Sequence, residues 1–406
     1  MTIKNKIKKK ITMSSQTDFI YNYQKMLYDG KKDELNRFFH DKIHNLEFDT
    51  LSVFSTIINH QTKRLPVYEK KLILPNLVNI PGFDASNFHY MNSGLVRLPN
   101  GRLFGIARFV NYNIKNGSWI INDKKGHFLS LIAGYYITEN GDVEENWLYP
   151  WSYDLPVSTK ATIFGFEDPR IFIFKNRTFV ICNTQQASDK RFNQMVLLSL
   201  SEDLRKIDRW IFLGITGHDD VFNNSCQKNW SPVVANEDEA FLIYSTQPWV
   251  ILDLLPAINE TKEKKIELLV IANHSIPSLP FPRVRFQTPG LNIGDGFLFM
   301  VHTAYYANPQ KYVYVSQLVY TNDVLKPEKV SEIFYFNNNG IEICHGWEYN
   351  KDKKIVYMMI NKDDETCYFS IVDIKIFLQS LKWFPADDSD VKPNKRTIFV
   401  NSPIAK

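Results

Sequence analysis

Short apolar runs separated by turn residues recur from about residue 50 to the end of the chain. The runs are rich in Val, Ile, Phe and Tyr, and the turns between them include Pro99-Asn100-Gly101, Asn140-Gly141, Asn236-Glu237-Asp238 and Gly294-Asp295-Gly296. Short runs of this composition, bounded by turn residues, are typical of β-strands. The pattern therefore predicts an all-β fold.

Five strand–turn–strand units each begin with a short polar segment, and successive units lie roughly 60 residues apart. The polar segments are 92–94, 167–170, 228–230, 285–287 and 344–346. A repeated small sheet is typical of a β-propeller, in which the sheets surround a central channel. We therefore predict a five-bladed β-propeller whose polar segments meet at one end of the channel. Their Asn, Asp, Arg, Lys and His residues suit a polar ligand, either anionic or sugar-like.

The N-terminal region follows a different pattern. Residues 1–15 are polar and Lys-rich, which predicts a tail, whereas apolar residues recur at helical spacing over residues 17–46, with Asp18 as the N-cap. We therefore predict a basic tail and helical extension over 1–48 and the catalytic propeller over 49–406. The helices would cover the core or join two copies of the chain into a homo-oligomer.

Two further segments carry local predictions. Residues 373–383 suit a short helix near the end of the chain, and the polar stretch 255–266 suits an exposed loop.

Composition excludes several classes of protein. The chain has 406 residues, a charged fraction of 23% and a net charge of +4, which is too small to argue for a nucleic-acid partner. No window approaches the ~20 apolar residues of a membrane span, and the N-terminus lacks the apolar region of a signal peptide. These features predict no membrane span and a cytoplasmic location.

The cysteines are few and scattered. Cys182, Cys226, Cys344 and Cys367 stand singly, without the spacing of a zinc site or of a disulfide framework. No DxD-type metal motif stands out near the polar segments. We therefore expect no metal and no cofactor, and a reducing compartment.

The sequence GFEDPRIF, residues 165–172, carries the sharpest chemical signal. Asp168 precedes a proline, which favours an extended backbone, so Asp168 and Arg170 are expected on one face and Glu167 on the other. Arg170 would bind a phosphate or carboxylate, and Asp168 would transfer a proton at a glycosidic oxygen. A structural Asp–Arg ion pair that closes a turn is the equally weighted alternative.

Two other segments offer ligand contacts. Lys228 suits a phosphate or a sugar hydroxyl and Trp230 suits stacking on a sugar ring, although a surface lysine and a core tryptophan are the ordinary interpretations of such residues. His302, with Tyr305 close behind it, ends the fourth unit. Arg108 ends the first unit at the equivalent place. A lone histidine in a strand is usually a core or hydrogen-bonded residue, so the hypothesis depends on such residues recurring through the repeat.

The segments HYMNSGLVRLPNGRLFGIARFV, FGFEDPRIF and KNWSPV, in this order, resemble the fungal β-1,2-mannosyltransferases. They also resemble the five-bladed propellers that include the β-mannoside phosphorylases of glycoside hydrolase family 130 and the protozoan mannosyltransferase/phosphorylases. The resemblance covers roughly residues 85–365, and EDPR followed by KNWSP is its most specific part.

The resemblance implies an inverting reaction on a β-mannosyl unit, with Asp168 as the general acid or base. It places Arg170 at the donor phosphate or sugar, Lys228, Arg285 and His302 at the phosphate, Asn92 and Arg108 at the mannose, and Asp363 or Asp364 at the mannose hydroxyls. The remaining residues expected to line the site are Glu167, Asn229, Trp230, Tyr305 and His345.

The leading hypothesis is a β-mannosyltransferase that moves mannose from GDP-mannose or mannose 1-phosphate to a mannose-containing oligosaccharide. A β-mannoside phosphorylase or hydrolase is the nearest rival, and Lys190-Arg191 is the only nearby candidate for a further basic pair typical of the phosphorylases. Two non-enzymatic hypotheses also stay open: a glycan-binding propeller and a protein-interaction propeller. Unlike the fungal transferases, this chain shows neither membrane anchor nor signal.

Overall fold

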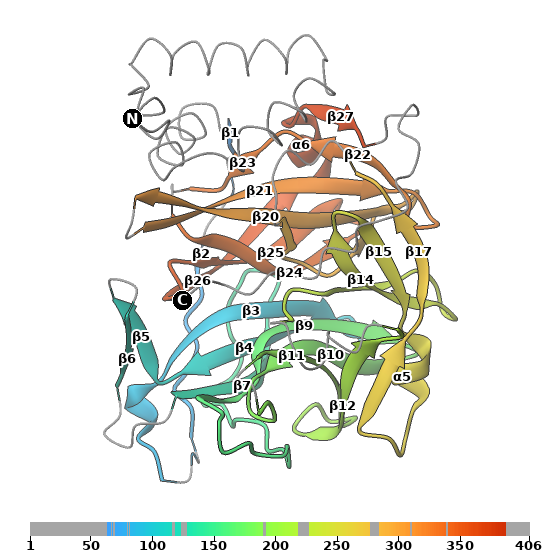
Figure 1. Cartoon of the computed structure of the whole chain (residues 1–406). Helices are drawn as coiled ribbons and strands as arrows, with labels where there is room; N and C mark the ends of the chain where they lie inside the picture. The colour runs from blue at the N-terminus through green and yellow to red at the C-terminus, as the bar shows by residue number, and fades with distance from the viewer. Residues whose placement is uncertain are drawn as a thin grey trace, which may run out of the picture. The chain divides into compact units, whose positions relative to one another are not determined.

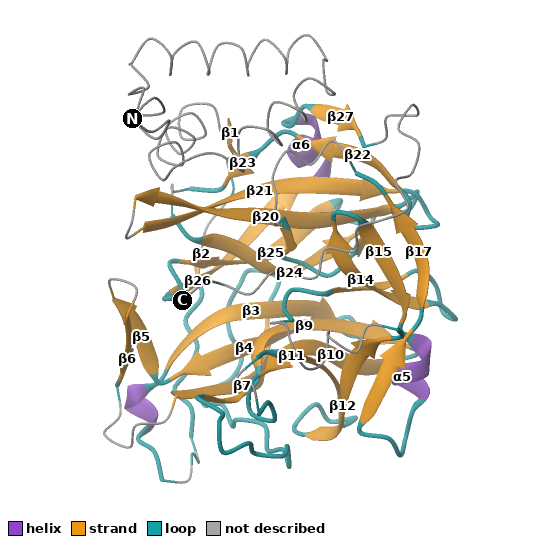
Figure 2. Cartoon of the chain, viewed as in Figure 1, coloured by secondary structure: helices purple, strands orange, loops and turns teal. Residues whose placement is uncertain are grey.

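Strands make up most of the regular structure in the computed structural model (Figures 1 and 2). The structure describes residues 63–386, apart from 66, 68–69, 79, 81, 116–117, 123–127, 190–191, 218–226, 277–283, 309–310 and 338–339. The predicted helical extension over 1–48 and the Lys190-Arg191 pair lie outside these residues. Within the described part the helices are short: η2 (Ala85–Asn87), α5 (Leu255–Asn259) and α6 (Ile374–Gln379).

The β3 sheet contains the first strand–turn–strand unit. Its strands, in spatial order, are β3 (His89–Arg97), β4 (Leu103–Val110), β7 (Phe128–Ile137) and β8 (Ile163–Gly165). The β3–β4 turn contains the predicted Pro99-Asn100-Gly101, in which Gly101 has a φ of +84° that suits glycine. A two-stranded ribbon, β5 (Tyr112–Lys115) and β6 (Ser118–Ile121), leaves this sheet between β4 and β7.

The next two units form the β9 sheet and the β13 sheet. The β9 sheet orders β9 (Glu167–Phe174), β10 (Arg177–Thr184), β11 (Gln194–Leu200), β12 (Ile207–Ile215) and β16 (Lys265–Leu268). The β13 sheet orders β13 (Ser231–Val234), β14 (Ala240–Thr246), β15 (Trp249–Asp253) and β17 (Val270–His274).

The last two units form the β20 sheet and the β24 sheet, which also take in strands from the start of the described region. The β24 sheet orders β24 (Glu342–Asn350), β25 (Ile355–Lys362), β26 (Thr366–Asp373) and β2 (Lys70–Lys71). The main path of the β20 sheet runs through β18 (Arg285–Phe286), β20 (Phe297–Asn308), β21 (Lys311–Thr321), β23 (Phe334–Tyr335) and β1 (Lys63–Arg64). Off this path lie β19 (Leu291–Asn292), β22 (Pro327–Ser331) and β27 (Trp383–Pro385).

Each of these sheets packs its apolar face on the next one in sequence order. Phe104 of the β3 sheet joins Val180 of the β9 sheet in one buried cluster, and Phe179 on the other face of the β9 sheet joins Leu242 of the β13 sheet. Alternate side chains of a strand point to opposite faces, so one strand serves two clusters. Apolar layers thus alternate with the sheets in this part of the molecule.

The same packing continues until the last sheet meets the first. The Trp249 ring of the β13 sheet lies 5.1 Å from the Phe299 ring of the β20 sheet, Met300 of the β20 sheet joins Met358 of the β24 sheet, and Tyr357 on the opposite face of β25 joins Tyr135 of the β3 sheet. Full burial of one such side chain contributes about 1.5–3 kcal/mol. The arrangement is propeller-like and mostly β, as the sequence predicted; the division into five blades stays a prediction, because the β20 sheet branches.

The two local predictions had different outcomes. The helix expected in 373–383 is α6, capped by Asp373, whose carboxylate accepts a hydrogen bond from the Ile376 amide at 2.9 Å. The loop expected over 255–266 is confirmed only for residues 260–264, most of which are exposed. Its first residues form α5 and its last form β16, because Ala257 and Ile258 are buried in the core and Lys265–Leu268 pairs with β12.

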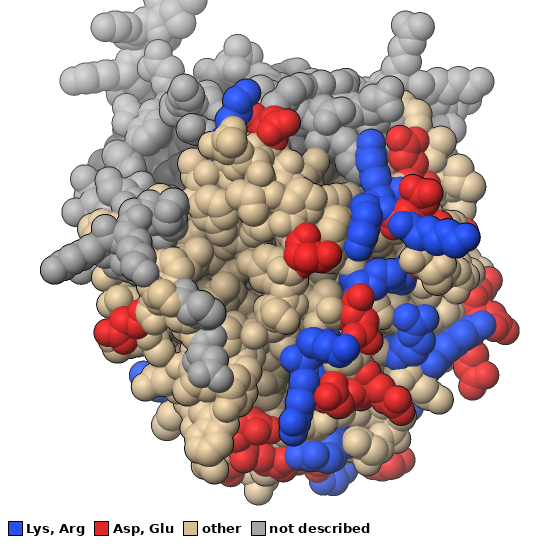
Figure 3. Space-filling model, turned by 90° about the horizontal axis from the view of Figure 1, so that it is seen from below, with Lys and Arg blue, Asp and Glu red and all other residues tan. Residues whose placement is uncertain are grey.

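The surface of one face mixes both charges. Seen from below, blue and red side chains are interspersed along one side of the described surface, and the middle of the described surface is mostly uncharged (Figure 3). No helix in the described part of the chain is long and apolar enough to cross a membrane. Cys182, Cys344 and Cys367 are buried and free.

Candidate active site

Three polar residues with left-handed backbones mark the beginning of the first three units. Asn92 in β3 has a φ of +48°, Asp168 in β9 a φ of +54°, and Asn229, just before β13, a φ of +61°. Asn and Asp tolerate this conformation better than most residues. The expectation of an extended backbone at Asp168 is therefore wrong, because the fold overrides the preference that Pro169 imposes.

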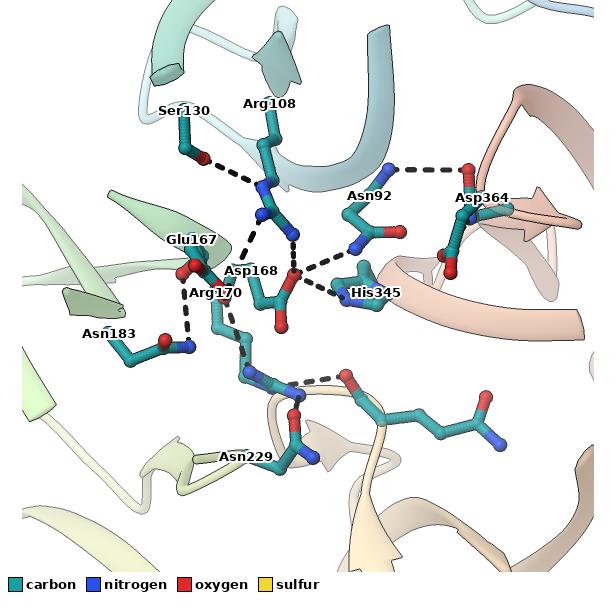
Figure 4. A network of polar contacts seen from close by, with 12 residues as sticks. Asn92, Arg108, Ser130, Glu167, Asp168, Arg170, Asn183, Asn229, His345 and Asp364 are labelled. Atoms are coloured by element: carbon teal, nitrogen blue, oxygen red, sulfur yellow. Dashed lines mark hydrogen bonds and ion pairs between the residues drawn. The ribbon is translucent and has the colours of Figure 1, made fainter. Parts of the chain in front are cut away.

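Several side chains surround one oxygen of the Asp168 carboxylate (Figure 4). Its Oδ1 accepts hydrogen bonds from Asn92 Nδ2 at 2.7 Å and from Arg108 Nη1 at 3.0 Å, and His345 Nε2 lies 3.8 Å away, beyond hydrogen-bonding distance. None of the described residues donates a hydrogen bond to Oδ2. The side chain keeps 12% of its surface accessible. One oxygen is thus held in place while the other is open to a ligand.

Arg108 is held by groups of the β3 sheet, the β5–β6 ribbon and the β9 sheet. Its Nε donates to Ser130 Oγ at 2.7 Å and its Nη2 donates to Tyr112 Oη at 2.6 Å. The same Nη2 lies 3.5 Å from Glu167 Oε2, in ion-pair range. A guanidinium held by this many partners presents Nη1 to Asp168 in one fixed direction.

The electrostatics favour the ionised form of Asp168. Burial by itself raises the pKa of the Asp168 carboxyl, but the positive charge of Arg108, with a smaller contribution from Lys228, opposes it and brings the pKa well below the ordinary value of aspartate.

Arg170 forms no ion pair with the Asp168 carboxylate among the described contacts, unlike the structural Asp–Arg pair that was one of the two alternatives for this motif. It is fully buried, and its guanidinium donates to four acceptors: the carbonyl oxygens of Asp168, Phe286 and Gln287 and the side-chain oxygen of Asn229. Glu167 was expected to point away from Asp168, but it shares Arg108 with it. The predicted bidentate contact of Arg170 with an anion is not favoured by this geometry.

Asp363 and Asp364 differ in their surroundings. The half-buried Asp364 accepts through Oδ1 from Asn361 Nδ2 at 3.3 Å, and Asn361 Oδ1 in turn accepts from the Asn92 main-chain amide at 3.3 Å. Burial, and then the charge of Asp168, raise the pKa of Asp364 to about 6 against the opposing charge of Arg108. Asp363 is exposed and accepts from the Ile341 main-chain amide at 3.3 Å. Of the two, Asp364 is the one linked through Asn361 to Asn92, a neighbour of Asp168.

A pair of buried histidines completes the site from the β20 and β24 sheets. His302 lies opposite Arg285 in the β18–β20 pairing and stacks on Tyr314, with ring centres 5.0 Å apart. Burial, and then Arg285, lower the pKa of His302 well below its ordinary value, and burial also lowers the pKa of His345. Both imidazoles are therefore neutral near pH 7.

Two expected contacts have other outcomes. Trp230 is 1% exposed, lies in the core and donates from Nε1 to Gln227 Oε1 at 3.3 Å, so it is the core tryptophan and cannot stack on a sugar. The side chain of Tyr305 lies outside the described residues. Asn229 is present at the site, where it holds Arg170.

Several buried polar atoms around Asp168 lack hydrogen-bond partners within the described part of the chain. They are Asn92 Oδ1, Glu167 Oε1, His302 Nδ1 and both ring nitrogens of His345. Buried polar groups are nearly always paired in folded proteins, so these unpaired atoms are a feature of the surroundings of Asp168. The cluster contains acceptors as well as potential donors.

Sequence reasoning missed the residues that orient the site. Four residues contact Arg108, Asn92 or Arg170: Tyr112, Ser130, Asn361 and Gln287. The first three lie outside the repeated polar segments. Gln287 lies inside one of these segments but contacts Arg170 through its main-chain carbonyl oxygen. The contact between Ser130 and Arg108 depends on the register in which β4 and β7 pair, which places Val110 opposite Ser130. No spacing in the sequence signals such a contact.

Comparison with known proteins bears on the fold. No protein-family model matches the chain, and no curated protein sequence matches it. The structure is similar to a glycosyl hydrolase from Bacteroides ovatus (TM-score 0.50, 15% identity, 78% of this chain and 98% of that one). It is also similar to a β-1,2-mannobiose phosphorylase from Listeria innocua (0.48, 14%, 78% and 99%) and to a GDP-Man-dependent mannosyltransferase from Leishmania mexicana (0.47, 10%, 79% and 94%).

These proteins are of the kinds that the sequence motifs resemble, and at such identities the similarity concerns the fold. Within the described residues, no group of three or more His, Cys, Asp or Glu side chains is placed to hold a metal ion.

Proposed function

We propose that this chain is an inverting glycosyltransferase that moves mannose from GDP-mannose or mannose 1-phosphate to a mannose-containing glycan, with Asp168 as the general base. The observation that supports this most directly is the Asp168 carboxylate, which is held ionised on Oδ1 by Arg108 and Asn92 and is open on Oδ2. On the proposed five-bladed propeller, this carboxylate stands where all the sheets converge.

The polar surroundings of Asp168 suit a sugar as the ligand. Asp168 keeps 12% of its side-chain surface accessible, and its Oδ2 can accept a hydrogen bond from a ligand hydroxyl. A pyranose ring carries several hydroxyls, each of which donates and accepts. Together with the motifs that resemble mannosyl-transferring enzymes, this supports a mannosyl group beside Asp168.

The ionised form of Asp168 suits a general base. In transfer, an acceptor hydroxyl attacks C1 of the mannosyl donor, its proton passes to Asp168, and the bond between C1 and the phosphate oxygen breaks. In this proposal Lys228 and Arg285 stabilise the departing phosphate charge. Phosphorolysis is the reverse of transfer from mannose 1-phosphate and would use Asp168 as the acid, so product analysis is needed to separate the two directions.

Product analysis tests the proposal. The protein is incubated with an oligomannoside acceptor and either GDP-mannose or mannose 1-phosphate, and elongated products are sought by mass spectrometry. A parallel incubation of β-mannobiose with phosphate reports mannose 1-phosphate and so detects phosphorolysis. Elongation that is lost in Asp168→Asn supports the proposal. Mannose 1-phosphate without elongation would establish the phosphorylase instead.

Calorimetry distinguishes a non-catalytic glycan-binding propeller from an enzyme. A glycan-binding propeller would bind oligomannoside without turnover and would bind it equally well after Asp168→Ala. Such a result, with no product in any incubation, would overturn the proposal.

A further inference from the structure

We propose that Arg170 is a positioning residue, which holds the left-handed backbone of Asp168 by tying it to the next two sheets, rather than a ligand-binding residue. The inference rests on the proposed role of Asp168. It assigns to the arginine of the EDPR segment a function that the sequence did not indicate.

Arg170 makes all its described hydrogen bonds to groups of the protein. Nη1 donates to the Asp168 carbonyl oxygen at 3.2 Å, and Nη2 donates to Asn229 Oδ1 and to the Phe286 carbonyl oxygen, each at 3.0 Å. Nε donates to the Gln287 carbonyl oxygen at 3.1 Å. A guanidinium has five N–H groups, and four are used here. These acceptors come from the β9 segment, the start of the β13 sheet and the start of the β20 sheet, so one side chain joins three sheets.

Arg170 is more deeply buried than Asp168. Arg170 has no accessible surface, whereas the Asp168 side chain keeps 12% of its own. A phosphate or sugar that reaches Asp168 Oδ2 would have to displace several of these hydrogen bonds to touch Arg170. Leaving buried carbonyl oxygens unpaired is unfavourable, so such displacement is disfavoured. Arg170 therefore belongs to the frame of the site.

Arg170 bridges two residues that have unusual backbone conformations. Asp168 and Asn229 are both left-handed, and Arg170 holds the carbonyl oxygen of the first and the side-chain oxygen of the second. Asp168 also precedes Pro169, a position where an extended backbone is normally preferred. If Asp168 relaxed toward that conformation, its carboxylate would move away from Asn92 and Arg108. The hydrogen bond from Arg170 opposes this relaxation.

Two substitutions test the role without removing the site. Arg170→Lys keeps a positive charge and loses the planar fork of donors. Asn229→Gly removes one acceptor of Arg170, and glycine adopts the positive φ of this position freely. It is the milder change of the two and serves as the test if Arg170→Lys does not fold. Displacement of a catalytic group by about 1 Å costs about 100-fold in rate. We therefore expect kcat to fall about 10- to 100-fold in Arg170→Lys and about threefold or more in Asn229→Gly, with the donor KM within threefold of wild type.

A double-mutant cycle sharpens the result. If the two residues act through one bridge, the combined variant should be no slower than Arg170→Lys alone. A donor KM that rises at least tenfold in Arg170→Lys with kcat unchanged would show that Arg170 binds the donor, and would overturn the inference. Fully additive losses in kcat would overturn it as well.

A readout without turnover separates this inference from the proposed function. The ¹³C carboxyl resonance of Asp168, assigned by its disappearance in Asp168→Asn, reports the titration of that carboxyl in each variant. We expect the titration midpoint to rise in Arg170→Lys and in Asn229→Gly, because Oδ1 is then held less firmly by Arg108 and Asn92. A midpoint unchanged in both folded variants would overturn the positioning role, whether or not the protein transfers mannose.

Discussion

Arg108 Nη1 lies 3.0 Å from Asp168 Oδ1 in a pair whose two side chains are 7% and 12% exposed. The pair joins the end of β4 to the start of β9, so it connects two sheets as well as two charges. Because only Oδ1 is engaged, the pair can stabilise the carboxylate while Oδ2 accepts a proton from a ligand. The same contact thus serves both structure and the proposed chemistry.

Replacing Asp168 by Asn should remove activity and preserve the fold. Asn tolerates the left-handed backbone, and its side-chain oxygen can still accept from Arg108, but it cannot take a proton at neutral pH. We expect mannosyl transfer to fall by about 100-fold or more, measured by product formation, with an unchanged far-ultraviolet circular dichroism spectrum. Activity close to wild type in this variant would remove Asp168 from the mechanism.

Replacing Arg108 by Met should destabilise the protein in a pH-dependent way. A carboxyl whose pKa is depressed in the folded state contributes stability above its unfolded pKa of about 3.9, and the contribution is lost as the pH falls through the folded pKa. Without Arg108 the pKa of Asp168 rises, so that contribution is missing at neutral pH. We expect a loss of about 3 kcal/mol in the free energy of unfolding at pH 7, measured by urea denaturation.

The loss should shrink below about pH 4, where Asp168 becomes protonated in the variant and in the unfolded chain. Adding Asp168→Asn to Arg108→Met serves as the control, since the part of the loss that comes from Asp168 should then disappear, whereas Glu167, which shares Arg108, still loses its partner. A loss that is constant from pH 3 to pH 7 would argue against the ion pair as its cause.

Replacing Asp364 by Asn should stabilise the protein above pH 6. The folded-state pKa of Asp364 is raised to about 6, so folding takes up a proton and stability declines as the pH rises through that value. Asn has no charge to bury and keeps the acceptor for Asn361. We expect a gain on the order of 1 kcal/mol at pH 8 and little change at pH 4, measured by urea denaturation at both pH values.

Asp363→Asn is the matched control for this prediction, because Asp363 is the adjacent residue, also has a positive φ and is exposed. It should show no comparable gain at pH 8. Equal effects of the two substitutions would contradict the raised pKa of Asp364.

Replacing Gly346 by Ala should disturb the contact between the first and last sheets. A Cβ at Gly346 would lie 2.3 Å from the Leu95 amide nitrogen and within 3 Å of the Gly94 backbone, so β24 and β3 would have to separate. Such overpacking costs about 3 kcal/mol, measured as a lower free energy of unfolding. A Cβ at Gly101 would meet no atom, so Gly101→Ala should lose only the backbone strain of a positive φ, about 1 kcal/mol in the free energy of unfolding. If the two variants lost equal stability, the close approach of β3 and β24 would be in doubt.

The strand–turn–strand units were predictable because they depend on local patterns. Alternating apolar residues and turn residues such as Asn100-Gly101 are visible in the sequence, and β3–β4, β9–β10 and β24–β25 pair as expected. The recurrence of polar residues before these strands led to Asp168 and Arg108, which the structure brings together.

The parts that were not predictable depend on contacts between distant segments. The rule that residues i and i+2 share a face failed at Asp168, because Arg170 and the neighbouring sheets hold its backbone left-handed. The role of Trp230 depends on which side of its segment faces the core, and the placement of Ser130 and Tyr112 depends on strand register. Strands as short as Lys63–Arg64 and Lys70–Lys71 carry no periodic signal at all.

Those two short strands have a consequence for how the molecule is made. Lys70–Lys71 completes the sheet that holds β24, β25 and β26, and Lys63–Arg64 pairs with β23, so segments far apart in the chain share a sheet. A nascent chain emerges from the ribosome N-terminus first and tends to fold in that order. Here residues 63–71 must wait, unpaired, for partners that are synthesised near the end, so the final closure of the sheets is expected only after translation has almost finished.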